Sequence, residues 1–174
     1  MTSTAIRPIV AIAGGTGKLG SHITAALLSP QFSSSFKEVR LLTSNPSSDV
    51  AKGFSSKGAK TIGVNYTDEQ SILSAIHGAD VLINSLGGSV KGFPAKNAVM
   101  RAAVKDGGIK VYFPSEYGIG NMQLNQVNID HRPKDFAHTE WDKKMDHQNE
   151  ARKSNMKVCA VYCGLFMESR CSPR

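Results

Sequence analysis

The stretch VAIAGGTGKLGSHI, from Val10 to Ile23, decides which fold class the chain is expected to adopt. A short apolar run, Ile9 to Ala13, leads into it, and apolar residues at helical spacing follow from Leu19 to Leu28. A glycine-rich turn between a strand and a helix is the setting in which the dinucleotide-binding fingerprint operates. The alternative is a tight bend without a ligand, and the remaining strands have to distinguish the two.

The turn itself satisfies two glycine spacings, G-x-x-G-x-x-G from Gly14 and G-x-G-x-x-G from Gly15. The early glycines permit a tight turn and the approach of a pyrophosphate to the backbone, and the last lets the helix pack closely on the strand. The N–H groups and the positive dipole end of the following helix favour phosphate. We therefore expect a cofactor to contact Gly14, Gly15, Thr16, Gly17, Lys18, Leu19 and Gly20.

Apolar runs that predict strands alternate along the chain with segments that predict helices. The expected strands begin at Ile9, Val39, Ala59, Asp80, Ile109 and Lys157, and the expected helices cover 18–29, 48–57, 68–77, 94–106 and 139–153. Most of the strands are almost continuously apolar, which indicates that both faces of the sheet are covered. The alternation predicts an α/β fold of the Rossmann type, a doubly wound parallel sheet, as one NAD(P)-binding domain over residues 1–174.

Composition narrows the classes of partner. The chain has 174 residues, of which 40% are hydrophobic, enough for one sizeable core. The net charge of +7 suits an anionic ligand, but Lys and Arg are scattered and not interleaved with aromatic residues, so we expect no nucleic-acid partner. Since no leader and no membrane-spanning apolar stretch is visible, we expect no membrane partner and a cytoplasmic location.

Cysteine and histidine spacing gives no metal site. Cys159, Cys163 and Cys171 match no zinc pattern, and an odd count gives no disulfide framework, so reduced thiols are expected. His131, His138 and His147 likewise form no pattern that identifies metal ligands.

The end of the second expected strand bears on the choice of cofactor. An Asp or Glu at this point binds the ribose 2′-hydroxyl of NAD and repels the 2′-phosphate of NADP. Here Ser44 and Asn45 follow the strand, whereas Asp49 comes later and is expected to cap the next helix. Ser44 and Asn45 can donate hydrogen bonds to a phosphate, and Lys18 is expected nearby. We predict NADPH, with NADH as the alternative.

The fourth and fifth expected strands run into further candidate cofactor contacts. The fourth ends NSLGG, so that Ser85, Leu86 and Gly87 either leave room for the cofactor or form a plain loop. The fifth runs into FPSEYG, whose Ser115 supplies a hydroxyl to the same site. No tyrosine has a lysine four residues on, so the usual Tyr-x-x-x-Lys pair is absent. The polar stretch that follows, 114–138, is expected to be a lid over the site.

The segment HTEWDKKMDHQNEARK, from His138 to Lys153, predicts a helix with Lys143 and Lys144 in its first turns. A lysine buried beside a cofactor can have its pKa lowered and act as an acid or a base. The alternative is that both lysines are solvated, as lysines on a helix usually are.

In this order and spacing, GGTGKLG, DVLINSLGG, KVYFPSEYG, EWDKK and VYCGLF resemble the NmrA-like/isoflavone reductase-like family, particularly its fungal members. The resemblance implies an atypical short-chain dehydrogenase with a Rossmann fold. Many such proteins reduce aromatic or phenylpropanoid substrates with NADPH, whereas others are regulators that bind dinucleotide without turning it over. The expected function is hydride transfer from NADPH to a small aromatic, carbonyl or unsaturated substrate. A regulator that binds a protein partner is the alternative.

The resemblance also places the active-site lysine of the family on Lys144, or on Lys143 if the alignment shifts by one residue. Two positions depart from the family pattern: Ser44 stands where reductases commonly have an arginine for the 2′-phosphate, and Gln148 stands where a basic residue is often found. Relatives continue past GLF into a substrate-binding portion, which we expect to be largely missing here. A truncated product without activity is therefore a third possibility.

Overall fold

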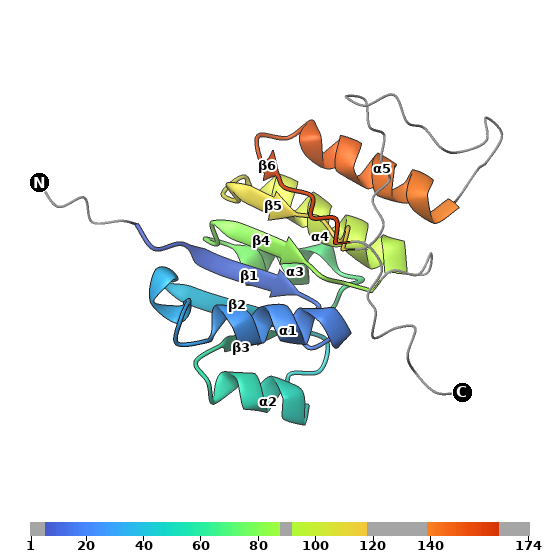
Figure 1. Cartoon of the computed structure of the whole chain (residues 1–174). Coiled ribbons are helices and arrows are strands. Elements are labelled where there is room, and N and C mark those ends of the chain that lie inside the picture. The colour runs from blue at the N-terminus through green and yellow to red at the C-terminus, as the bar shows by residue number, and fades with distance from the viewer. Residues whose placement is uncertain (1–5, 88–91, 118–138, 164–174) are drawn as a thin grey trace, which may run out of the picture.

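Six parallel strands form one sheet in the computed structural model, which describes residues 6–87, 92–117 and 139–163. The strands are β1 (Ile9–Ala13), β2 (Glu38–Thr43), β3 (Lys60–Gly63), β4 (Val81–Asn84), β5 (Val111–Phe113) and β6 (Lys157–Val158). Their order is β3-β2-β1-β4-β5-β6, so the direction of winding reverses between β1 and β4 (Figure 1). This is the strand order of the doubly wound dinucleotide-binding fold, and the predicted fold class is confirmed.

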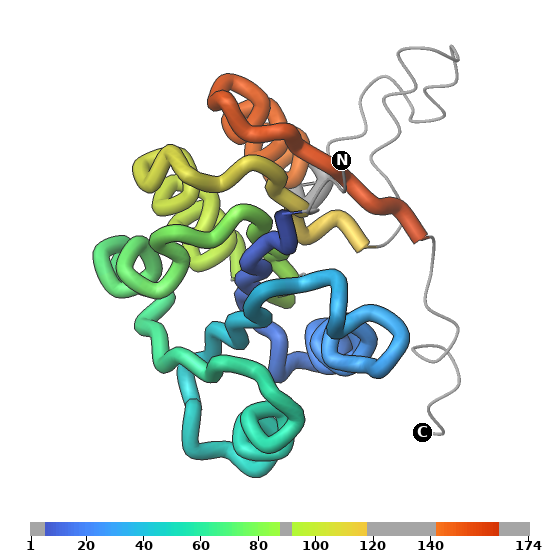
Figure 2. The backbone as a smooth tube through the Cα atoms, turned by 90° about the vertical axis from the view of Figure 1, so that its left-hand side faces the viewer, coloured from blue at the N-terminus to red at the C-terminus, as the bar shows by residue number. Residues whose placement is uncertain are grey.

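Helices cover both faces of the sheet, as the two views in Figures 1 and 2 show. One face carries α1 (Lys18–Leu27) and α2 (Asp49–Ser55), and the other carries α3 (Glu69–Ile76), α4 (Phe93–Asp106) and α5 (Thr139–Arg152). A short 3-10 helix, Ser33–Ser35, precedes β2. All five predicted helices are present, each within three residues of its expected bounds.

The side chains of β1 explain why the sheet is covered on both sides. Val10 and Ile12 pack on the α1 face with Ile23, whereas Ala11 and Ala13 belong to the larger core under α3 and α4. These four residues of β1 are almost fully buried. Because alternate residues of a strand point to opposite faces, a strand buried on both sides reads as the continuous apolar run seen in the sequence.

The last strand is shorter than its apolar run predicts. Only Lys157 and Val158 pair with β5, and the Cys159 N–H then donates to the Tyr112 carbonyl at 2.9 Å. The next residue after β5 is Pro114, which has no N–H to extend a ladder. Tyr162 is consequently exposed, not part of a strand.

The cap of α2 also differs from the prediction. Ser48 is the residue before the helix, and its hydroxyl accepts a hydrogen bond from the Ala51 N–H at 3.3 Å. Asp49 is the first helical residue, where its charge favours the positive end of the helix dipole. The expectation that Asp49 caps the helix was wrong by one residue, because serine is an equally good cap.

Within the described ranges, no helix has the length and apolarity needed to cross a membrane. The same ranges hold no cluster of three or more His, Cys, Asp or Glu arranged to bind a metal. Cys159 and Cys163 are unpaired, exposed thiols. Cys171, His131, His138 and residues 118–138 of the predicted lid, which was expected over 114–138, lie outside the described residues.

Candidate functional site

The glycine-rich turn lies at the carboxyl end of β1, beside the point where the strand order reverses. Gly14 has φ +76°, a conformation that glycine adopts without strain. The Gly17 N–H donates to the Gly14 carbonyl at 2.9 Å and closes the turn. The chain then enters α1 directly, with the Ser21 N–H bonded to the Gly17 carbonyl at 2.8 Å.

Two further glycines allow the turn to pack without side chains. A β-carbon at Gly15 would lie 2.8 Å from Thr24 Oγ1 and would collide with the Leu41 side chain. A β-carbon at Gly20 would lie 2.6 Å from Ser85 Oγ and would collide with the Gly14 carbonyl oxygen. The turn therefore needs glycine at both positions for close packing of the helix on the strands.

The start of α1 has the properties of an anion site. Gly17 supplies no side-chain cap, and the first turn contains no acidic residue. The first N–H groups of a helix have no acceptor within the helix, and the helix dipole makes this end positive. Lys18 is exposed at the first helical position. Together these groups favour a phosphate at the turn.

Tyr66 braces the turn from a distant part of the chain. Its hydroxyl accepts the Gly14 N–H at 3.0 Å and donates to the Leu42 carbonyl at 2.8 Å. Burial raises the pKa of Tyr66 to about 12, so the hydroxyl stays protonated near neutral pH. Tyr66 could not be predicted as part of the site, because no local pattern in the sequence connects it with residues so far away.

The end of β2 presents hydroxyl and amide groups to the edge of the sheet that holds the turn. Thr43 Oγ1 lies 3.3 Å from Thr16 Oγ1 and accepts the Asn45 N–H at 3.2 Å. Ser44 and Asn45 are exposed directly after the strand. No carboxylate follows β2 until Asp49, inside the next helix.

The segment after β4 joins the turn to the end of β5. Ser85 is buried, and its hydroxyl donates to the Ala13 carbonyl at 2.7 Å. The backbone of Leu86 lies so close to Gly14 that a β-carbon there would sit 3.0 Å from the Leu86 nitrogen. The Leu86 carbonyl in turn accepts a hydrogen bond from Ser115 Oγ at 2.7 Å. Gly87, the last described residue of this segment, is exposed.

The two candidate lysines on α5 have different environments. Lys144 Nζ lies 3.8 Å from Glu116 Oε2, with side chains 12% and 1% exposed respectively. Lys143 Nζ instead lies 5.9 Å from the centre of the Phe93 ring. Lys144 is therefore the lysine turned toward the residues that follow β5, a distinction that the sequence left open.

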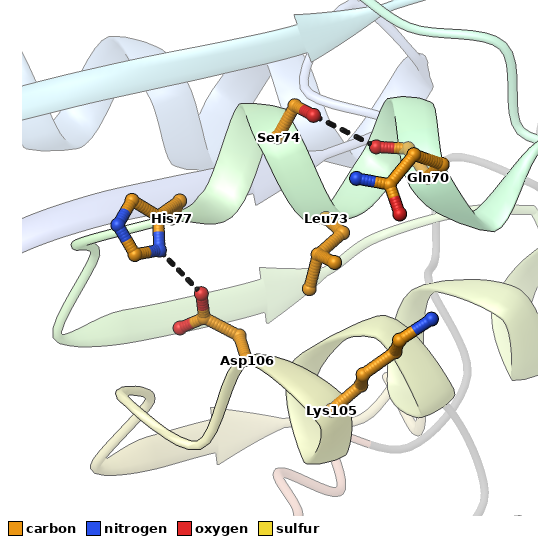
Figure 3. A pocket seen from close by; sticks show the side chains of 6 residues that line it. All are labelled: Gln70, Leu73, Ser74, His77, Lys105 and Asp106. Carbon is orange, nitrogen blue, oxygen red and sulfur yellow. Dashed lines mark hydrogen bonds and ion pairs between the residues drawn. The ribbon is translucent and has the colours of Figure 1, made fainter.

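A groove elsewhere on the molecule lies between α3 and α4 (Figure 3). His77 and Asp106 border it, joined by a hydrogen bond of 2.9 Å between Nδ1 and Oδ1. Both lie at the C-terminal ends of their helices, hence at the edge of the sheet away from the glycine-rich turn. Ligands of open α/β sheets bind outside the carboxyl ends of the strands, so this groove is not the candidate site.

The strand order and the turn at the reversal point define a Rossmann-type dinucleotide-binding fold. The chain belongs to the NmrA-like family, whose model matches residues 7–173.

Similar proteins include plant reductases. The chain is 27% identical over 163 residues to a probable pinoresinol-lariciresinol reductase 3 of Arabidopsis thaliana, covering 91% of this chain and 47% of that protein. It is 33% identical over 121 residues to phenylcoumaran benzylic ether reductase TP7 of Nicotiana tabacum, covering 68% and 38%. Among solved structures, AtPrR2 with NADP+ and (+)pinoresinol has a TM-score of 0.73 at 22% identity, over 92% of this chain and 51% of that one. The chain thus spans about half the length of these relatives, or less.

Proposed function

We propose that the chain binds NADPH and transfers hydride from it to a small aromatic substrate at a carbonyl or unsaturated carbon. Three observations support the proposal. The chain belongs to the NmrA-like family, the relatives described above are named as reductases, and a protein of the same fold is titled with NADP+ and pinoresinol.

The residues of the site suit the cofactor. Backbone N–H groups at the start of α1 and the Lys18 ammonium would hold the pyrophosphate. Ser44 and Asn45 would hold the 2′-phosphate, and no carboxylate stands there to repel it. The proposed contacts are Gly14, Gly15, Thr16, Gly17, Lys18, Leu19, Gly20, Ser44, Asn45, Ser85, Leu86, Gly87 and Ser115.

One observation carries the proposal of an enzyme. A continuous series of contacts runs from Gly14 to Leu86, from Leu86 to Ser115, and through the adjacent Glu116 to Lys144. The glycine-rich turn and Lys144 therefore lie at the same edge of the sheet. A cofactor on the turn and a substrate beside it would both be within reach of this edge.

The cofactor, when bound, supplies the hydride, and the protein supplies orientation and a proton. Glu116 holds the Lys144 side chain toward the site through the ion pair. The Lys144 ammonium has three N–H donors, which can orient a substrate oxygen and deliver a proton to it.

Titration of the whole 174-residue chain with NADPH and NADH, followed by nicotinamide fluorescence, tests the proposal. We expect NADPH to bind at least about tenfold more tightly than NADH, a difference of about 1.4 kcal/mol. Lys18→Ala should weaken NADPH binding, whereas Lys57→Ala, which changes an exposed lysine in the turn after α2, should not. Failure of a folded sample to bind either dinucleotide would overturn the proposal.

Two alternatives give different results in the same experiments. A regulator that binds a protein partner would bind NADPH but would not oxidise it with (+)-pinoresinol or with other phenylpropanoid or quinone acceptors. An inactive product would bind neither dinucleotide. A reductase would bind NADPH and would oxidise it when an acceptor is present.

A further inference from the structure

Four buried or partly buried polar side chains from four different elements form one hydrogen-bonded chain behind the candidate site. Asn84 Nδ2 at the end of β4 donates to the Tyr112 hydroxyl of β5 at 2.9 Å. The same hydroxyl lies 2.8 Å from His147 Nε2 on α5. His147 Nδ1 lies 2.6 Å from Asn97 Oδ1 on α4. Asn84, Tyr112 and His147 are at most 5% exposed.

The donors and acceptors of this chain fit one protonation state of His147. Asn97 Oδ1 is an acceptor, so His147 Nδ1 carries the proton and donates it. Nε2 then has a lone pair for the Tyr112 hydroxyl, which also accepts from Asn84. Burial and the nearby Lys96 ammonium lower the pKa of His147 to about 4, in agreement with a neutral ring.

This hydrogen-bonded chain includes a residue of α5, the helix that also carries Lys144. His147 and Lys144 are three residues apart, so both lie on the side of α5 that faces the sheet. Their partners, Tyr112 and Glu116, are four residues apart in the β5 segment. The contact between Tyr112 and His147 is shorter and more deeply buried than the contact between Glu116 and Lys144.

The Asn84 end of the hydrogen-bonded chain reaches the glycine-rich turn. Asn84 Oδ1 accepts the Leu86 N–H at 3.3 Å, and the Leu86 backbone lies against Gly14. Asn84 Nδ2 additionally donates to the Lys96 carbonyl at 3.2 Å, which fixes the orientation of the amide. One set of side chains therefore connects α5 to the loop that borders the turn.

We propose that Tyr112 and His147 are positioning residues that hold α5 in register with the sheet and thereby place the Lys144 amine at the candidate site. The part of this inference that concerns catalysis rests on the proposed function. The part that concerns the location of the amine does not. Neither residue touches the glycine-rich turn directly; each acts through Lys144 and its helix.

Site-specific labelling of lysine amines tests the location of Lys144 without turnover. The whole chain is treated with formaldehyde and dimethylamine–borane, and fragments that separate Lys143 from Lys144 are quantified by mass spectrometry over time. Tyr112→Phe and His147→Ala should each speed the methylation of Lys144 by about threefold or more through local opening. The rate at Lys143 should stay as in the wild type, which makes it an internal control.

Two more variants separate positioning from general loosening. Tyr162→Phe removes the hydroxyl of an exposed tyrosine, which accepts a part-buried hydrogen bond from Gln148 of α5, and it should leave Lys144 methylation unchanged. His147→Gln retains an amide oxygen for Tyr112 and should restore protection relative to His147→Ala. Circular dichroism confirms that each variant is folded.

Unchanged Lys144 methylation in folded Tyr112→Phe and His147→Ala would overturn the inference. An equal rise at Lys143 and Lys144 would do the same, because it reports loosening of the whole helix end. A wild type that neither binds nor oxidises NADPH would overturn the proposed function, and the labelling result would still decide the positioning inference. Where oxidation is seen with (+)-pinoresinol, Tyr112→Phe should lower kcat in the wild-type background and have no further effect in Lys144→Ala.

Discussion

The hydroxyl of Tyr66 accepts a hydrogen bond from the backbone N–H of Gly14 at 3.0 Å, although the two residues are 52 positions apart. The same hydroxyl donates to the Leu42 carbonyl, so the first turn of the fold is tied to the end of β2 by one side chain. The turn is therefore held from outside as well as by its own glycines. A turn held in one conformation before a ligand arrives binds with less loss of entropy.

Removal of this brace should weaken both the fold and the site. In Tyr66→Phe, the Gly14 N–H and the Leu42 carbonyl lose their partner, which should lower the free energy of unfolding by about 1–3 kcal/mol. NADPH binding should weaken as well. Urea denaturation and dinucleotide titration measure the two effects. Tyr162→Phe, which loses one part-buried hydrogen bond, should lower stability by less than Tyr66→Phe, which loses two; equal losses in the two variants would contradict the role of Tyr66.

Gly20 should tolerate no side chain. In Gly20→Ala the new methyl group would collide with the Gly14 carbonyl oxygen and approach Ser85 Oγ, so either the turn or α1 must shift. We expect a loss of about 1–3 kcal/mol in stability, as for other overpacked sites, and loss of NADPH binding. Gly53→Ala is the matched control, because Gly53 lies inside α2 with open space around it. That change should stabilise the protein by about 0.5–1 kcal/mol.

A carboxylate placed after β2 should reverse the cofactor preference. Ser44→Asp would put a negative charge where the 2′-phosphate is proposed to lie, and it would supply an acceptor for a 2′-hydroxyl. NADPH affinity should fall by about tenfold or more, or 1.4 kcal/mol, while NADH affinity is kept or improved. Ser34→Asp adds the same charge in the exposed 3-10 helix before β2 and should affect neither. Parallel effects of Ser44→Asp on both dinucleotides would argue against Ser44 as the contact to the 2′-phosphate.

The two lysines of α5 should differ in their effect on turnover. Lys144→Ala removes the amine beside Glu116 and should lower kcat by about 10²–10⁴-fold, the usual contribution of a positioned acid or base. NADPH binding should be little changed. Lys143→Ala removes only the amine near Phe93 and should leave kcat close to that of the wild type. Steady-state oxidation of NADPH measures both, and the reverse ranking would assign the role to Lys143.

Acidification should destabilise the protein through His147. Its pKa is lowered to about 4 in the folded chain by burial and by Lys96, whereas the ordinary value is 6.5. Between these pH values the unfolded chain therefore binds more protons than the folded chain. The contribution of His147 to stability is fully present above pH 6.5 and is lost as the pH falls toward 4. The loss attributable to this residue should be roughly 3 kcal/mol. Unfolding at several pH values should show a smaller decline for His147→Gln than for the wild type, and identical declines would contradict the assignment.

Local features of the sequence were sufficient for the class of fold. The alternation of apolar runs and helical segments predicted each strand and helix, and the Gly14–Gly20 spacing predicted a turn that side chains would obstruct. These signals act over a few residues, because they arise from backbone sterics and from the period of burial. The same locality explains the errors at β6 and at the cap of α2, where the outcome depended on a neighbouring strand or on one residue of shift.

The sequence by itself thus determined a doubly wound fold, the glycine-rich turn and a lysine-bearing helix. Only the tertiary structure decided that Lys144 and not Lys143 faces Glu116, that Tyr66 braces Gly14, and that Tyr112 bonds to His147. Each of these contacts joins residues from separate elements. Their distances depend on the order of the strands and on the rotation of each helix about its axis, and packing of the whole core sets both.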